Sequence, residues 1–112
     1  MLTGFVQEVD GIMKLNFRAT GKRIAEATKS QLSRLATNKF MRYAAHIRKV
    51  RIDVDEQPCQ RHGMLTICKV EVLLPGLPSV SVRAKGKNMM QVIKRALRDS
   101  ELLLARQFNR AA

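Results

Sequence analysis

The chain has 112 residues, enough for one small hydrophobic core and little else. It carries 21 Lys and Arg residues against nine Asp and Glu residues, a formal net charge of +12. Aromatic residues make up only 4%, which argues against a binder that relies on stacking bases over an aromatic platform. There is no apolar run of 18 residues and no signal-peptide pattern, and two cysteines do not suggest a secreted scaffold. We therefore expect a cytoplasmic protein.

The first predicted strand follows a segment without a clear period. Residues 1–11 are assigned to an N-terminal extension that need not be structured. Residues 13–19 alternate between apolar and polar side chains, which predicts a half-buried strand. Residues from about 22 to 36 predict a helix, because one stripe of a 3.6-residue period contains Ile24, Thr28, Leu32 and Leu35. After them, Phe40, Tyr43 and Ile47 either continue this helix or pack as an irregular connection.

Three further strands follow the helix. Residues 50–54 alternate and predict the second strand, and residues 56–63, which contain a proline and a glycine, predict a loop. A third strand is predicted at about residues 65–74. Residues 75–78 read Pro-Gly-Leu-Pro, a strong turn signal, and residues 80–85 alternate again to predict the fourth strand.

A long amphipathic helix closes the chain. Asn88 is its expected N-cap, and Gln91, three residues later, completes a capping-box pattern. The element order is therefore β-α-β-β-β-α, and each strand has only one apolar face to cover. We predict an α/β (α+β) two-layer sandwich in residues 12–112, a single domain. Its mixed four-stranded sheet carries both helices on one face, with the first two strands parallel.

Positive charge is concentrated in two parts of this frame. The stretch from Lys14 to Arg51 holds eleven Lys or Arg residues and one acid, Glu26, and residues 72–98 contain no acid. Apolar residues recur through both stretches at helix or strand spacing, so the charge belongs to a folded surface. The natural partner of such a surface is a polyanion, most commonly nucleic acid.

Four sequence features together resemble one known family. They are Thr20-Gly21 after the first strand, Ile47-x-x-Val50 at the start of the second, Ala84-Lys85-Gly86 after the fourth, and a last helix opening Asn88-Met89-Met90-Gln91-Val92-Ile93. Over residues 12–108 the chain resembles the short ribosome hibernation promoting factors, also called the ribosome-associated inhibitor family. That family usually reads Asp-Met-Tyr-Ala-Ala-Ile-Asp at the last helix, so Met90 and Lys94 depart from its pattern.

The resemblance implies a non-enzymatic protein that binds the small ribosomal subunit and its rRNA in stress or stationary phase. Family members lie in the mRNA channel near the decoding centre, across the A and P sites, and block translation. The chain looks like the short form, which lacks the C-terminal domain that pairs ribosomes. We expect a monomer with no cofactor, no small-molecule substrate and no membrane partner.

Basic side chains on the two helices and their flanks are the candidates for rRNA contacts, because Lys and Arg contacts to phosphate fix position with little base readout. The expected rRNA-binding residues are Arg18, Lys22, Arg23, Lys29, Arg34, Lys85, Lys87, Lys94, Arg95 and Arg98. The outer sides of the helices are expected to form one positive surface, which is the stronger candidate for binding rRNA. The polar sheet face is more mixed, since it includes Asp53, Asp55 and Glu71.

The sequence also bears on three other functions: metal binding, catalysis and a different kind of binding module. Cys59, His62, Cys68 and His46 do not have the spacing of a paired-knuckle zinc site, and no nucleophile and base pair stands out, so we expect no metal and no catalytic residues. A double-stranded RNA-binding module, α-β-β-β-α, remains an alternative, although the strand at residues 13–19 argues against it. A protein-interaction module for an acidic partner is the other alternative.

Overall fold

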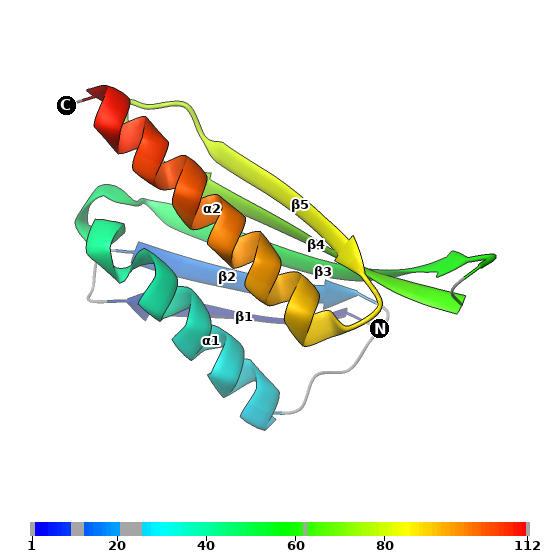
Figure 1. Cartoon of the computed structure of the whole chain (residues 1–112). Helices are drawn as coiled ribbons and strands as arrows, with labels where there is room; N and C mark the ends of the chain where they lie inside the picture. Colours follow the sequence, from blue (N-terminus) through cyan, green and yellow to red (C-terminus); the bar gives the residue numbers. More distant parts are fainter. Residues whose placement is uncertain (1, 10–12, 21–25, 62, 112) are drawn as a thin grey trace.

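The computed structural model describes residues 2–9, 13–20, 26–61 and 63–111 (Figure 1). Its elements, in chain order, are β1 (Leu2–Val9), β2 (Met13–Thr20), α1 (Glu26–Phe40), the 3-10 helix η1 (Met41–His46), β3 (Lys49–Cys59), β4 (Gly63–Leu73), β5 (Val80–Gly86) and α2 (Met89–Ala111).

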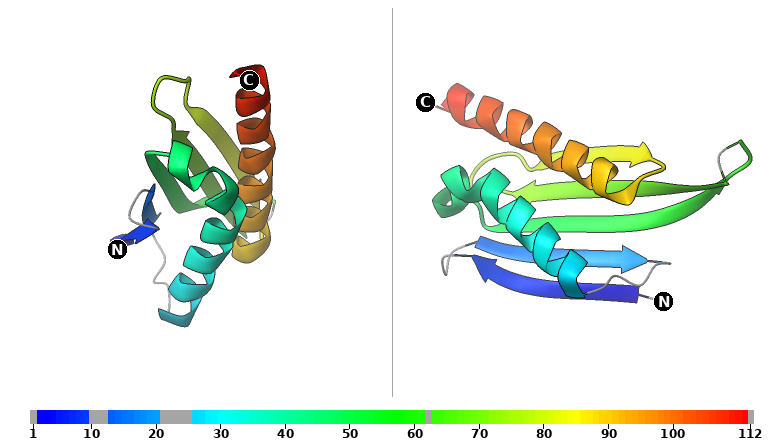
Figure 2. Two further views of the ribbon diagram at one scale, coloured as in Figure 1. Left: turned by 90° about the vertical axis from the view of Figure 1, so that its left-hand side faces the viewer. Right: turned by 60° about the horizontal axis from the view of Figure 1, so that its bottom comes forward.

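One sheet of five strands in the order β1-β2-β3-β4-β5 forms the first layer. Strands β2 and β3 are parallel and the other neighbours are antiparallel, so the predicted mixed sheet is confirmed in strands β2 to β5. The helices α1 and α2 lie side by side on one face of the sheet, as the two views in Figure 2 show. This is the expected α+β sandwich.

Strand β1 is the difference from the four-stranded prediction. The structure places Leu2–Val9 in a strand, within the segment expected to be an extension, and pairs it with β2 from Leu2–Thr20 to Val9–Met13. Its sequence lacks an apolar–polar alternation. The strand forms nevertheless, because backbone hydrogen bonds to its neighbour can hold an edge strand. The periodicity of a buried face is then not required.

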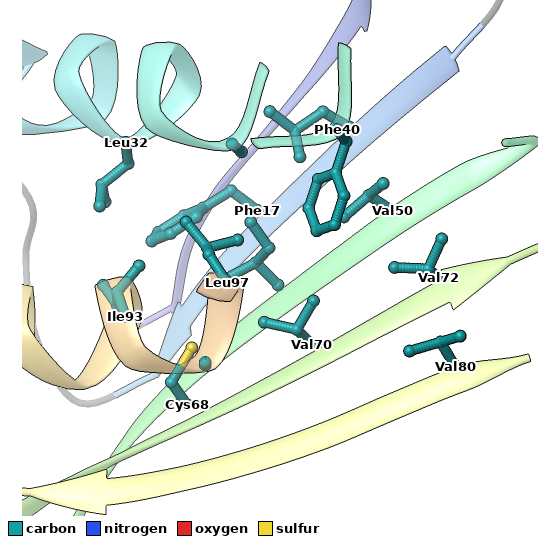
Figure 3. Packing of buried hydrophobic residues seen from close by; sticks show 14 of the residues in the cluster. Phe17, Leu32, Phe40, Val50, Cys68, Val70, Val72, Val80, Ile93 and Leu97 are labelled. Carbon is teal, nitrogen blue, oxygen red and sulfur yellow. The ribbon is translucent and has the colours of Figure 1, made fainter. Parts of the chain in front are cut away.

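Alternating residues of the strands and one stripe of each helix build the core (Figure 3). In β2 the inward residues are Leu15, Phe17 and Ala19, each at most 2% exposed. Helix α1 buries Leu32, Ala36 and Phe40, which follow one another at the i, i+4 spacing of a helix face. Because Phe40 continues this stripe, α1 extends through Phe40, which was one of the two possibilities that the sequence left open.

Helix α2 starts where the sequence predicted. The backbone N–H of Gln91 donates a hydrogen bond of 3.0 Å to Oδ1 of Asn88, which confirms Asn88 as the N-cap. Val92 and Ile93 begin the buried stripe, and Leu104 continues it three turns later. None of the described helices is long and apolar enough to cross a membrane.

The predicted loop at residues 56–63 is wrong, because most of it is strand. Strand β3 continues to Cys59 and β4 begins at Gly63, and they pair from Lys49–Leu73 out to Cys59–Gly63. Gly63 has φ of +72°, which suits glycine at the tight end of this hairpin. Pro58 and Gly63, which predict a loop over the whole segment, lie at the end of the hairpin.

Candidate nucleic-acid interface

The solvent side of α1, η1 and α2, here called the helix face, carries more cations than acids among the described residues. Because Val92, Ile93 and Ala96 are buried, the helical period turns the basic residues between them outward. The exposed cations of this face are Arg34, Arg42, Lys94, Arg95, Arg98 and Arg106, with Lys29 and Lys39 half-buried. Its described acids are Asp99 and Glu101, both half-buried.

Five of the predicted contact residues come together on the helix face: Lys29, Arg34, Lys94, Arg95 and Arg98. Lys87, which is exposed, lies in the connection from β5 to α2 at the edge of the same face. Lys22 and Arg23 lie outside the described residues.

Two of the α2 cations have partners within the protein. The guanidinium of Arg95 donates a hydrogen bond through Nη2 to the backbone carbonyl of Lys85, so it ties the first turns of α2 to the end of β5. Arg98 forms an ion pair of 3.5 Å with Asp99, and the Arg98 side chain is 62% exposed and that of Asp99 44%. A pair at the surface contributes little to stability, so the exposed side chain of Arg98 remains able to exchange Asp99 for a phosphate.

The helix face also contains cations that the sequence analysis did not select. Lys39 is half-buried near the end of α1, and Arg42 is exposed in η1. The signal was present, because both belong to the basic stretch that begins at Lys14. The sequence leaves open whether the helix continues past Ala36, so it assigns Lys39 and Arg42 to no face.

Arg18 and Lys85 lie on the other side of the molecule, on the outer face of the sheet. Both alternate with buried residues that face the helices. A row across four strands reads Arg18, Asp53, Lys69 and Arg83 in the register, and these residues line a shallow cavity of about 370 Å³. The acids Asp53 and Asp55 belong to this lining. The sheet face thus mixes acids with a larger number of cations.

A second hollow on the molecule, of about 600 Å³, lies where β2 and β3 begin and β4 ends. Its charged lining residues are Lys14, Arg48 and Lys49. In the register, Lys14 lies opposite Glu8 of β1. None of its three cations was among the predicted contact residues.

The two cysteines occupy different environments. Cys68 is fully buried in β4, and burial, with a smaller contribution from the charge of Asp53, raises its pKa to about 12. Such a thiol is protonated at neutral pH and is a poor nucleophile and a poor metal ligand. Cys59 is partly exposed beside the hairpin end, five register pairs away from Cys68. The structure therefore separates Cys59 from Cys68, and His62 lies outside the described residues.

Among the described residues there is no group of three His, Cys, Asp or Glu side chains that could hold a metal ion. His46, considered with them, packs against Phe108, with ring centroids 5.3 Å apart. Phe108 in turn stacks on Tyr43 at 5.0 Å. This cluster joins η1 to the end of α2.

Two solved structures share this fold. One is a ribosomal subunit interface protein from Coxiella burnetii, with 18% sequence identity and a TM-score of 0.59 over 85% of this chain and 92% of that chain. The other is the N-terminal domain of Protein Y from Thermus thermophilus, with 18% identity and a TM-score of 0.59 over 82% of this chain and 92% of that chain.

No protein-family model matches the chain, and no curated protein matches its sequence. The two structural neighbours match the family that the sequence resembles. At 18% identity the property that this chain shares with them is the fold, and the fold that the resemblance implied is confirmed.

Proposed function

We propose that this protein is a ribosome-associated translation inhibitor that binds the small ribosomal subunit through its helix face. The rRNA contacts lie in the decoding region and mRNA channel, and binding promotes hibernation under stress or in stationary phase. The protein acts in the cytoplasm as a monomer, without a cofactor and without catalysing a reaction.

The observation that carries this proposal is the cationic helix face on a fold shared with a ribosomal subunit interface protein. Six exposed cations on one face, from Arg34 to Arg106, give a surface whose sign and extent suit a folded rRNA. Recognition of such RNA depends on shape and on phosphate contacts, so the scarcity of aromatic residues is no obstacle. The net charge of +12 costs stability through self-repulsion, which a bound polyanion relieves.

Charge reversal on one face at a time tests the proposal. The helix-face variant carries Arg34→Glu, Lys94→Glu and Arg98→Glu, and it spares Arg95 because that side chain holds the carbonyl of Lys85. The matched control carries Lys14→Glu, Lys69→Glu and Arg83→Glu on the outer face of the sheet, with the same change in net charge. Both variants change exposed side chains only, so both should fold.

Binding to purified small subunits is measured by sedimentation at several salt concentrations. For six phosphate contacts, counterion release predicts roughly a 10³-fold loss of wild-type affinity between about 50 and 200 mM salt. At low salt the helix-face variant should bind about 10³-fold more weakly, about tenfold for each lost contact. The sheet-face control should lose less than about tenfold, because exposed charges beyond a Debye length are screened.

Equal losses in the two variants would show attraction by net charge alone, and unchanged binding of the helix-face variant would remove that face from the site. Binding that is flat in salt would instead favour a protein-interaction module. Preference for naked double-stranded RNA over subunits would favour the double-stranded RNA-binding module. The position of β2 weighs against that last reading, because it is an interior strand whose Leu15 and Phe17 are buried in the core.

A further inference from the structure

The hollow of about 600 Å³ at the end of the sheet is built by three segments that are far apart in the sequence. These are the start of β2, the connection from η1 to β3, and the end of β4 with the turn that follows it. Backbone hydrogen bonds tie them together: the N–H of Lys14 donates to the carbonyl of Arg48 (3.4 Å), and the N–H of Arg48 donates to the carbonyl of Leu73 (2.9 Å). The fold therefore sets the shape of the hollow, and its volume lies within the roughly 300–1,000 Å³ of small-molecule sites.

Every charged residue that lines this hollow, among those that the structure describes, is a cation. Lys49 has no acid directly opposite it on either neighbouring strand. Lys14 lies opposite Glu8, and a carboxylate at that position offsets at most one of the three positive charges. Glu71, the acid of β4, is already in an ion pair of 3.6 Å with Arg51. The hollow thus keeps an excess of positive charge, and a bound anion would relieve the repulsion among its cations.

The part of the lining that comes from β4 and the following turn is mostly apolar. It contains Leu73, which is half-buried, Leu74, which is buried, and Pro75, which is exposed. The turn is closed by a hydrogen bond of 3.4 Å from the N–H of Leu77 to the carbonyl of Leu74, and Gly76 has φ of +75°. Proline followed by a glycine with positive φ is the pattern of a type II turn, which fixes the position of Pro75. The hollow therefore combines cations from β2 and β3 with apolar residues from β4 and its turn.

We propose that this hollow binds a nucleoside di- or triphosphate. The phosphates contact Arg48, Lys49 and Lys14, and the base lies against Leu73 and Pro75. Lysine and arginine are usual partners of phosphate groups, and the faces of bases pack on apolar side chains. A ligand with phosphates alone would leave the apolar residues uncovered, and an apolar ligand would leave the cations without partners. A nucleotide satisfies both parts of the lining.

The hollow and the helix face lie on opposite sides of the sheet. Lys14 and Lys49 point away from the helices, because the residues that follow them, Leu15 and Val50, are buried in the core beneath the helices. A nucleotide in the hollow and a subunit on the helix face can therefore be bound at the same time. The nucleotide site does not depend on the proposed function, so the purified protein alone is enough to test it.

Isothermal titration calorimetry with ATP as the probe measures this binding. At about 150 mM salt, exposed charges more than about 8 Å apart are largely screened, so attraction by the net charge of +12 is reduced. The hollow variant carries Arg48→Ala and Lys49→Ala. The matched control carries Lys69→Ala and Arg83→Ala, two exposed cations of the same sheet face that do not line the hollow. The N–H of Arg48 that bonds to Leu73 is a backbone group, so the hollow variant keeps that bond.

We expect the hollow variant to bind ATP about 100-fold more weakly than the wild type, about tenfold for each lost charged contact. The control should lose less than about threefold. Adenosine, which has no phosphate, should give no measurable binding. ATP should bind the wild type at least about fivefold more tightly than tripolyphosphate, because its base covers the apolar residues of the hollow. Tripolyphosphate carries more negative charge than ATP, so charge alone predicts the opposite order.

A dissociation constant for ATP above about 1 mM would overturn the proposal, and so would equal losses in the two variants, which attraction by net charge would produce. Tripolyphosphate that binds as tightly as ATP would overturn the assignment to a nucleotide. Displacement of ATP by a short single-stranded RNA at the same phosphate concentration would also overturn it, because the hollow would then belong to an RNA-binding surface. None of these results decides the helix-face proposal, which is measured with subunits.

Discussion

Gly86→Ala tests how closely α2 packs against the end of β5. A Cβ atom built on Gly86 lies 2.9 Å from Cγ2 of Val92 and 3.7 Å from Nη2 of Arg95. The first distance is shorter than real carbon–carbon contacts, and the second is an ordinary contact. Val92 is only 2% exposed, so its side chain has little room to move away. We therefore expect the first turn of α2 to shift when the methyl group is added.

The size of the effect follows from two opposing contributions. Overpacking a well-packed site costs about 1–3 kcal/mol, while replacing glycine stabilises by about 0.4–1 kcal/mol through the unfolded chain. Gly86 does not have a positive φ, so no backbone strain is added. The net destabilisation should be about 1–2 kcal/mol. In a Val92→Ala background the clashing methyl group is absent, and Gly86→Ala should become stabilising by about 0.5 kcal/mol.

Urea unfolding of the wild type, the two single variants and the double variant measures this coupling. With a urea slope of about 1.5 kcal/mol/M, Gly86→Ala should lower the midpoint by about 1 M. The coupling energy between Gly86 and Val92 should be about 2 kcal/mol, within the range seen for residues in contact. An unchanged midpoint, or the same loss with and without Val92, would refute the close contact. The loss should persist in an Arg95→Ala background.

Two other predictions concern stability. Asn88→Ala removes the acceptor of the 3.0 Å hydrogen bond from Gln91 and should cost about 1 kcal/mol in urea unfolding, while Asn88→Asp should not. The raised pKa of Cys68, from 9.0 to about 12, means that the folded state keeps a proton that the unfolded state loses above pH 9. Stability from this group is therefore full below pH 9 and is lost as the pH rises towards 12. Between pH 8 and pH 10 the wild type should lose about 1.4 kcal/mol more than Cys68→Ala does, and equal losses would contradict the burial of the thiol.

The elements that the sequence predicted well are those with a buried face and a defined end. Residues 14–19 of β2 and residues 68–72 of β4 alternate, because every second side chain enters the core. Helix α2 has both an amphipathic period and an N-cap, Asn88, so its start was predicted to the residue. These signals are local, because each depends only on residues that are close together in the sequence.

The elements that were missed have no such local signal. Strand β1 and the end of the β3–β4 hairpin are held by backbone pairing with a neighbouring strand, which any side-chain pattern permits. Their sequences therefore resemble an extension or a loop. The position of η1 was missed for a related reason: the buried stripe of α1 ends at Phe40, and the six residues that follow form a 3-10 helix.

For the candidate site as well, some features follow from the sequence and others only from the structure. The sequence by itself determined the sign and amount of charge, the alternation of the core strands and hence the two-layer fold, because these depend on residue type and spacing. Only the tertiary structure decided which cations share a surface. Arg18 and Lys85 lie across the sheet from Lys94 and Arg98, and Asp53 and Asp55 share a cavity with Arg18, Lys69 and Arg83. Which side chains share a surface depends on contacts between segments far apart in the sequence, so no local sequence pattern predicts it.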